Sequence, residues 1–169
     1  KANKKVKALL AIFASTALIG ASVAAPANAA SKDLTVGMTL DMDKYDPHTA
    51  TSFGTIRVLG LAYGSLVEVG PKLDIRPGLA RAWGFNEEGT QLRLYLRKNV
   101  KFHDGSDFDA TDVKASLERI LDTATKAAAR SNIATISKIT IVSPTQVNLD
   151  LSQPNVPILA ALDGVNMSR

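Results

Sequence analysis

The residues most capable of chemistry lie in one acidic stretch, VKFHDGSDFDATDVKASLERIL, at residues 100–121. Within ten residues it contains His103, Asp104, Asp107, Asp109 and Asp112. Imidazole and carboxylate groups at this density could bind a metal ion or act as an acid and base pair. They could equally form a turn that leads into a helix, because Asp is favoured both in turns and at helix starts.

The spacing within this stretch argues against a metal site. A calcium-binding loop of the EF-hand type that began at Asp104 would need ligands at its third, fifth and twelfth positions. Those positions hold Ser106, Phe108 and Ala115. Zinc sites draw on several His or Cys residues, whereas the chain has two His and no Cys. We therefore predict no metal and no cofactor.

An enzymatic role for the stretch also lacks the usual companions. No activated Ser, Gly-rich phosphate-binding loop or nucleophile elbow accompanies the acids, so we predict no catalytic residue. As helix-start residues, in contrast, the acids are readily explained. Gly105 can adopt the positive φ of a turn, Asp109 can cap a helix that begins at Ala110, and Asp112 lies where the helix dipole favours a negative charge. The expected buried stripe then consists of Val113, Leu117, Ile120 and Leu121, with the cation Arg119 near the far end.

The first 29 residues have the features of a secretory signal peptide. Four Lys precede ALLAIFASTALIGASVAA at residues 8–25, and Pro26 and small residues follow. A positive start, an apolar centre and small residues at the −3 and −1 positions place the cut after Ala29, so that the mature chain begins at Ala30. The alternative is an uncleaved membrane helix, which Pro26 and the interspersed Ser, Thr and Gly residues disfavour. We expect an exported, periplasmic protein.

The net charge of +4 comes from this leader. The chain has 20 Lys and Arg against 16 Asp and Glu, and residues 1–29 contain four of the Lys and no acid. A neutral mature chain lacks the basic excess with which proteins bind nucleic acid. The absence of Cys excludes disulfides and thiolate metal sites.

The mature chain mixes short strands with helices, which indicates an α/β or α+β protein. Leu92, Leu94 and Leu96 alternate with polar residues and mark the clearest strand. Tyr63 and Trp83 could line a pocket, but we expect both to pack in the core or in a hairpin. The predicted elements are a strand at 33–40, a helix at 53–62, a strand at 65–69, a helical turn at 79–82, a hairpin of 83–86 with 90–97, a second hairpin at 139–151 and a helix that starts near 156.

An ordered set of motifs in residues 79–121 resembles a known family. The set consists of an Ala-x-x-Trp hairpin with a Gly turn, then Leu-Arg-x-x-Val-x-Phe-His-Asp-Gly, then Asp-Val opening a helix with Ser-Leu-x-Arg. YDP at residues 45–47 and SQPNVPIL at 152–159 fit the same order. These motifs resemble the extracellular solute-binding proteins of family 5, the binding components of peptide and nickel ABC importers.

The resemblance implies a mixed α/β fold of the type II periplasmic-binding-protein kind. Family members are several times longer than 169 residues and have two lobes, so residues 30–169 would form the N-terminal part of the solute-binding domain, within the first lobe. Such a protein captures a peptide or similar small solute without chemistry and delivers it to an ABC permease in the inner membrane. It is expected to be a monomer that binds no nucleic acid. Thr39, Leu40 and Asp41 would face the ligand cleft.

Three alternatives stay open on the sequence alone. The chain could belong to an exported hydrolase whose catalytic residues lie outside these 169 residues, or to a transcription regulator with the same ligand-binding fold, which the leader and the neutral charge disfavour. It could also be a non-functional truncated remnant. In that case unpaired strand edges and exposed apolar faces would favour aggregation.

Overall fold

The computed structural model describes residues 34–38 and 41–168. The chain divides into two compact units, residues 1–37 and 38–169. In the first unit the described residues 34–37 are exposed and lie in no helix or strand. The strand predicted at Asp33–Leu40 is therefore wrong over its described part, because a strand needs a hydrogen-bonded neighbour and no described segment pairs with residues 34–38.

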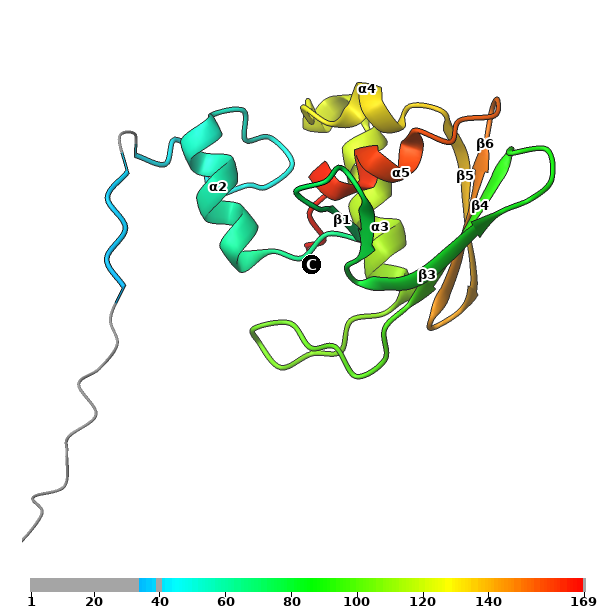
Figure 1. The fold of residues 1–169 in the computed structure, drawn as a ribbon, viewed down its shortest axis with the longest axis horizontal. Helices are drawn as coiled ribbons and strands as arrows, with labels where there is room; N and C mark the ends of the chain where they lie inside the picture. The colour runs from blue at the N-terminus through cyan, green and yellow to red at the C-terminus, as the bar shows by residue number, and fades with distance from the viewer. Residues whose placement is uncertain (1–33, 39–40, 169) are drawn as a thin grey trace, which may run out of the picture. The chain divides into compact units, whose positions relative to one another are not determined.

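The second unit is built on a four-stranded antiparallel sheet (Figure 1). Its strands are β3 (Ala80–Phe85), β4 (Gln91–Leu96), β5 (Ile136–Ser143) and β6 (Gln146–Leu151), in the order β3-β4-β6-β5. Both predicted hairpins are confirmed, β3 with β4 and β5 with β6. The helical turn predicted at residues 79–82 is wrong. Ala80 pairs with Leu96, and the Leu79 amide donates to the Ser65 carbonyl at 2.9 Å, so the backbone there is committed to strand pairing.

Aliphatic side chains from the two central strands form the middle of the core. They alternate along each strand and are at most 6% exposed; they are Leu92, Leu94 and Leu96 on β4 and Val147, Leu149 and Leu151 on β6. The register places Leu92 opposite Leu149 and Leu94 opposite Val147. Full burial of one such side chain contributes about 1.5–3 kcal/mol, so this double row is a main source of stability.

Helix α3 (Ala110–Leu121) covers the sheet and contacts β5 and β6. It begins where the sequence predicts. The Asp109 carboxylate accepts from the Thr111 amide at 2.6 Å, and the Asp112 carboxylate accepts from the Asp109 amide at 2.9 Å. This reciprocal capping box satisfies amides that the helix leaves free. Of the predicted stripe, Val113, Leu117 and Ile120 are buried and Leu121 is half-buried.

The remaining elements surround this core, and the predicted helix at 53–62 is confirmed. They are α2 (Phe53–Ala62), β1 (Val67–Val69), β2 (Ile75–Pro77), η1 (Thr123–Thr125), α4 (Arg130–Ile133), α5 (Ile158–Ala161) and η2 (Leu162–Gly164). β1 and β2 form a separate two-stranded sheet. α5 confirms the helix predicted near 156. Among the described residues no helix has the length and apolar character needed to cross a membrane.

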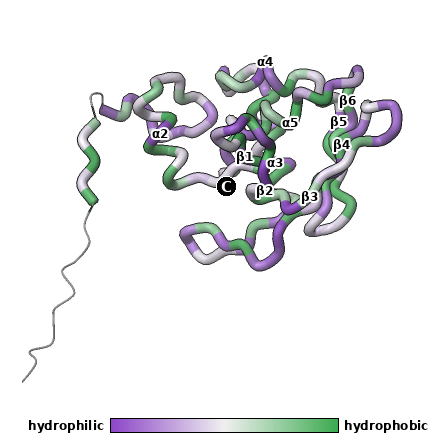
Figure 2. Tube along the Cα trace, in the orientation of Figure 1, coloured by the Kyte–Doolittle hydropathy of each residue, from purple (hydrophilic) through white to green (hydrophobic). Residues whose placement is uncertain are grey.

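The turn between β3 and β4 shows how side chains set the strand register. Asn86 accepts through its side-chain oxygen from the amides of Thr90 and Gln91, each at 2.8 Å. Gly89 adopts a φ of +68°, which disfavours any side chain. Figure 2 shows this turn as a hydrophilic segment between strands that carry apolar residues. The turn therefore stays in solvent while the leucines behind it are buried.

The capping box yields a stability prediction. Asp109→Ala should lower the free energy of unfolding by about 1 kcal/mol, because it removes the acceptor that caps α3. Asp107→Ala is the matched control. Asp107 lies two residues earlier, is 76% exposed in its side chain and pairs with Lys101 on the surface, so its loss should change stability by less than about 0.5 kcal/mol. Urea denaturation followed by circular dichroism measures both, and equal losses would contradict the capping role.

Candidate functional site

The acidic stretch forms a structured turn rather than a cluster of converging ligands. Asp104 accepts from the Ser106 amide at 2.9 Å and from its hydroxyl at 2.6 Å, while Asp107 pairs with the Lys101 ammonium at 2.7 Å. His103 is exposed. In the part of the chain that the structure describes, no three His, Cys, Asp or Glu side chains lie close enough to hold a metal ion. These acids therefore shape the backbone that enters α3.

The predicted ligand contacts are mostly outside the described residues. Four predicted site residues have no described position: Ala29, Ala30, Thr39 and Leu40. Asp41 is described and exposed. Two residues later the chain is anchored to α2, since the Asp43 amide donates to the Thr55 hydroxyl at 3.1 Å and that hydroxyl donates back to the Asp43 carboxylate. Asp41 therefore lies two residues before a position that is hydrogen-bonded to α2. Its contact with a ligand stays a prediction.

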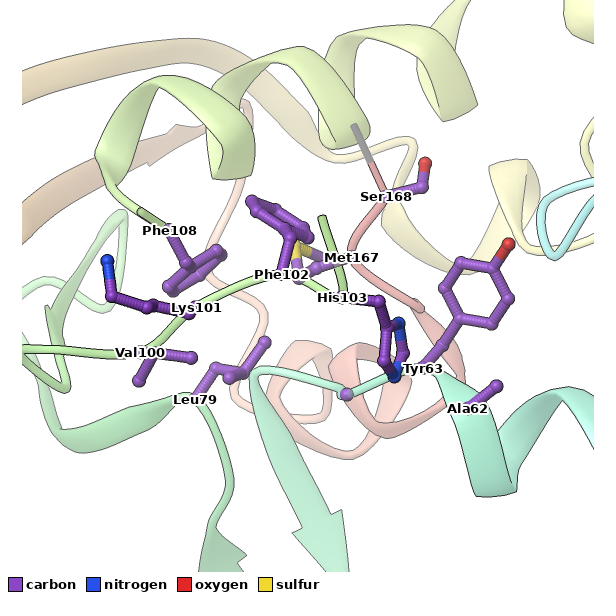
Figure 3. Close-up of a pocket in the computed structure, with 11 residues that line it drawn as sticks. Ala62, Tyr63, Leu79, Val100, Lys101, Phe102, His103, Phe108, Met167 and Ser168 are labelled. Atoms are coloured by element: carbon purple, nitrogen blue, oxygen red, sulfur yellow. The ribbon is translucent and has the colours of Figure 1, made fainter. Parts of the chain in front are cut away.

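A cleft of about 270 Å³ opens beside the turn at residues 100–108. Figure 3 shows Phe102 and Phe108 toward one end of this cleft and His103 and Tyr63 toward the other. The rings of Phe102 and Phe108 meet edge to face, with centroids 5.9 Å apart. Other lining residues are Leu79, Val100, Lys101, Met167 and Ser168. The lining combines apolar side chains with the polar side chains of Lys101, His103 and Ser168, which suits a ligand that carries both apolar and polar groups.

A second hollow, of about 470 Å³, runs along the exposed side of α3. Its lining includes three charged side chains and consists of Tyr45, Asp46, Pro47, Tyr63, Asp112, Ala115, Ser116, Arg119 and Ser168. Tyr63 and Ser168 line both hollows, so the two adjoin. Tyr63 is half-buried there rather than in the core, contrary to the prediction, whereas Trp83 packs against the core as predicted.

Asp46 and Arg119, which line the second hollow, form with His48 what we call the His48 cluster. The Arg119 guanidinium donates to both Asp46 carboxylate oxygens, at 3.0 and 2.6 Å, and to Nδ1 of His48 at 2.6 Å. The other ring nitrogen of His48, Nε2, lies 2.8 Å from the Asn166 carbonyl oxygen. His48 is only 3% exposed. The cluster thus joins a loop, a helix and a segment more than a hundred residues away.

The contacts in the cluster shift the acidity of its members. The hydrogen bond from Arg119 lowers the pKa of Asp46 to about 2, and the same bond raises the pKa of Arg119. Burial lowers the pKa of His48, and the hydrogen bond to the Asn166 carbonyl partly opposes this. The Arg119 charge lowers the pKa further and the Asp46 charge raises it, so that the pKa stays below its ordinary value. At neutral pH the cluster therefore holds an ionised Asp–Arg pair and a neutral imidazole.

Local sequence patterns do not predict this cluster. The place of Arg119 near the end of a helix is sufficient to explain it, and the YDP motif contributes only to the family resemblance. The pairing spans more than 70 residues, so no local pattern reveals it. The available signal was weak: His48 stands two residues after an Asp, in a segment that is otherwise polar loop.

Comparison with known proteins places this architecture in a family. Residues 74–167 match the family model of the bacterial extracellular solute-binding proteins, family 5, middle region. The match covers more than half of the chain and includes the whole four-stranded sheet and α3. The chain belongs to this family. Its fold is accordingly part of a type II periplasmic binding protein, as the motifs predict, and the family consists of binding proteins rather than enzymes.

Individual relatives agree with this assignment. The glutathione-binding protein GsiB of Escherichia coli K12 is 30% identical over 125 residues, which are 74% of this chain and 24% of GsiB. The binding protein AgaA of A. tumefaciens R10, solved with agropinic acid, is 36% identical with a TM-score of 0.62, over 66% of this chain and 23% of AgaA.

A further solved relative is the periplasmic binding protein DppA of Helicobacter pylori, solved with the peptide STSA. It is 25% identical with a TM-score of 0.64, over 73% of this chain and 28% of DppA. The chain thus spans about a quarter of the length of the relatives it matches.

The Asp46–Arg119 pair yields a second prediction. Its folded-state pKa of about 2 lies below the ordinary 3.8, so the pair adds stability that is present above about pH 3.8 and is lost as the pH falls toward 2. Arg119→Gln should abolish this acid dependence and cost about 1 kcal/mol at pH 7, a value reduced for solvent screening. In the Arg119→Gln variant, NMR titration should show that the pKa of the Asp46 carboxyl rises back toward 3.8. Arg93→Gln, on the sheet surface, is the control and should leave that titration unchanged.

Proposed function

We propose that this chain is part of the solute-binding component of an ABC importer and that its solute is a small peptide. The observation that carries the proposal is the family match over residues 74–167. Glutathione, which GsiB is named for binding, is a tripeptide, and DppA was solved with a tetrapeptide. AgaA, solved with agropinic acid, supports other small solutes as a second candidate class.

The role of this chain would be structural and ligand-contacting rather than chemical. The sheet, α3 and the His48 cluster form a connected base, and Asp41 lies two residues before the bond from the Asp43 amide to Thr55 on α2. Thr39, Leu40 and Asp41 are our candidates for ligand contact, with backbone hydrogen bonds to a peptide as in strand addition. A second lobe would close over the solute by a hinge motion, and the closed protein would dock on its permease.

The same proposal includes export to the periplasm as a monomer. Residues 1–29 would be removed as a signal peptide, and the mature chain would begin at Ala30. Relatives such as DppA are periplasmic binding proteins, which supports this compartment. The competing proposal is an exported hydrolase with catalytic residues elsewhere. Membership of a family of binding proteins disfavours it.

Isothermal titration calorimetry with glutathione, Ser-Thr-Ser-Ala and agropinic acid tests the function. We expect the complete gene product from which this chain derives to bind one of these probes with a Kd in the micromolar range or below. We expect the 169-residue chain alone to bind it at least about 100-fold more weakly, because a solute held between two lobes loses most of its buried contacts with one lobe absent.

The same mixtures analysed by mass spectrometry separate the alternatives. Intact peptides after prolonged incubation are expected, and release of amino acids would favour the hydrolase. Failure of the complete gene product to bind any small solute would favour a remnant without function. Tight binding by the 169-residue chain itself would refute the two-lobe arrangement.

Export can be tested independently of the solute. Mass spectrometry of the protein recovered from the periplasm of a Gram-negative host should show an N-terminus at Ala30. Ala29→Asp should block the cut, since the −1 position requires a small neutral residue. The control Ala24→Leu lies in the apolar centre and should be processed normally. Recovery of uncleaved protein in the membrane would instead support the membrane-helix alternative.

A further inference from the structure

His48 is a buried titratable group whose surroundings accept only one of its protonation states. An arginine side chain can donate hydrogen bonds but cannot accept them. The 2.6 Å contact from Arg119 therefore makes Nδ1 of His48 the acceptor. Nε2 must then carry the proton, which it donates to the Asn166 carbonyl oxygen at 2.8 Å. The ring is held as the neutral Nε2–H tautomer.

Uptake of a second proton would break this arrangement. It would place an N–H on Nδ1, directly against the Arg119 guanidinium, so that a hydrogen bond is replaced by two donors and two positive charges in contact. The charged groups that act on His48 are Arg119 on α3, which lowers its pKa, and Asp46 on its own loop, which raises it. Asp46 has both carboxylate oxygens engaged by Arg119 and also accepts from the His48 amide at 3.0 Å. Two uncharged backbone groups, the Asn166 carbonyl and the Ala128 amide, also bond His48.

The cluster holds segments that are far apart along the chain. The Ala128 amide, just before α4, donates to the His48 carbonyl at 3.2 Å. Asn166 itself bridges to Ser65 just before β1, and the next residue, Met167, donates to the Gly64 carbonyl at 2.9 Å. His48 therefore fastens the loop at residues 41–52 to the segment at 165–168.

We propose that the His48 cluster is an acid-released clasp, closed by the neutral imidazole and opened when His48 takes up a proton. Opening frees the 165–168 segment from the loop at 41–52. Because Met167 and Ser168 line the two hollows, release of this segment also changes the shape of both. The clasp makes the packing of this unit sensitive to mild acid, which a periplasmic protein meets when the surroundings acidify.

The pH window of the clasp is distinct from that of the Asp46–Arg119 pair. Burial lowers the pKa of His48 below its ordinary 6.5. The unfolded chain therefore binds a proton more readily than the folded one, so the stabilisation is complete above about pH 6.5 and is lost as the pH falls through the folded-state pKa. The loss from protonation of Asp46 follows only below about pH 3.8.

Two histidine variants test the proposal, because the chain has one His in the clasp and one exposed in a turn. His48→Gln keeps a side-chain donor and acceptor but does not titrate, and His103→Gln is the matched control. The Tm of the wild type and of His103→Gln should fall by about 2–4 °C from pH 6.5 to 5, whereas that of His48→Gln should stay level. A parallel fall in all three proteins would overturn the clasp.

NMR of the wild-type protein decides the question even if His48→Gln does not fold. The ¹⁵N shifts of the His48 ring should report the Nε2–H tautomer and a pKa below 6.5. Hydrogen exchange at the Met167 amide, corrected for its intrinsic pH dependence, should accelerate by at least tenfold as His48 titrates, while that of Leu94 in the sheet should not. An ordinary His48 pKa, the Nδ1–H tautomer or unchanged protection of Met167 would refute the proposal.

Discussion

The burial of two facing rows of aliphatic side chains, on β4 and β6, is the constraint on which the rest of the unit depends. With Leu94 opposite Val147 and Leu92 opposite Leu149, a shift of one residue would turn a whole row toward solvent. The register therefore fixes the two hairpins and the position at which α3 crosses the sheet. The position of α3 in turn determines where the acidic turn before it and Arg119 near its end lie.

Polar contacts hold together segments of the unit that its apolar core does not join. The sheet and α3 bury apolar surface together with Val165 and Met167 of the segment at 165–168, whereas the loop at 41–52 contributes no residue to this core cluster. The bidentate pair between Arg119 and Asp46 and the bonds of His48 tie these segments to the helix. The second hollow lies against this tie, because Asp46 and Arg119 line it. A group that responds to pH therefore lies next to a space large enough for a ligand.

Local patterns in the sequence predicted the local elements well. Alternation of leucines placed β4, and the Asp109 cap placed the start of α3, because each depends on residues a few positions apart. Two predicted elements are wrong because local sequence does not show which segments pair. Residues 79–82 resemble a helical turn until Ala80 is seen to pair with Leu96, and Leu34–Met38 resembles a strand although no described segment pairs with it. The His48 cluster was missed because its partners are remote in sequence, and no rule of spacing connects them.

The contact between His48 and Asn166 also bears on how this unit assembles. His48 and Asn166 are 118 positions apart in the sequence and yet are in hydrogen-bond contact. Such a contact has to overcome the entropy of closing a long loop, whereas each hairpin and α3 join residues that are close in the sequence. The bond between His48 and Asn166 therefore depends on the sheet and the helix being in place.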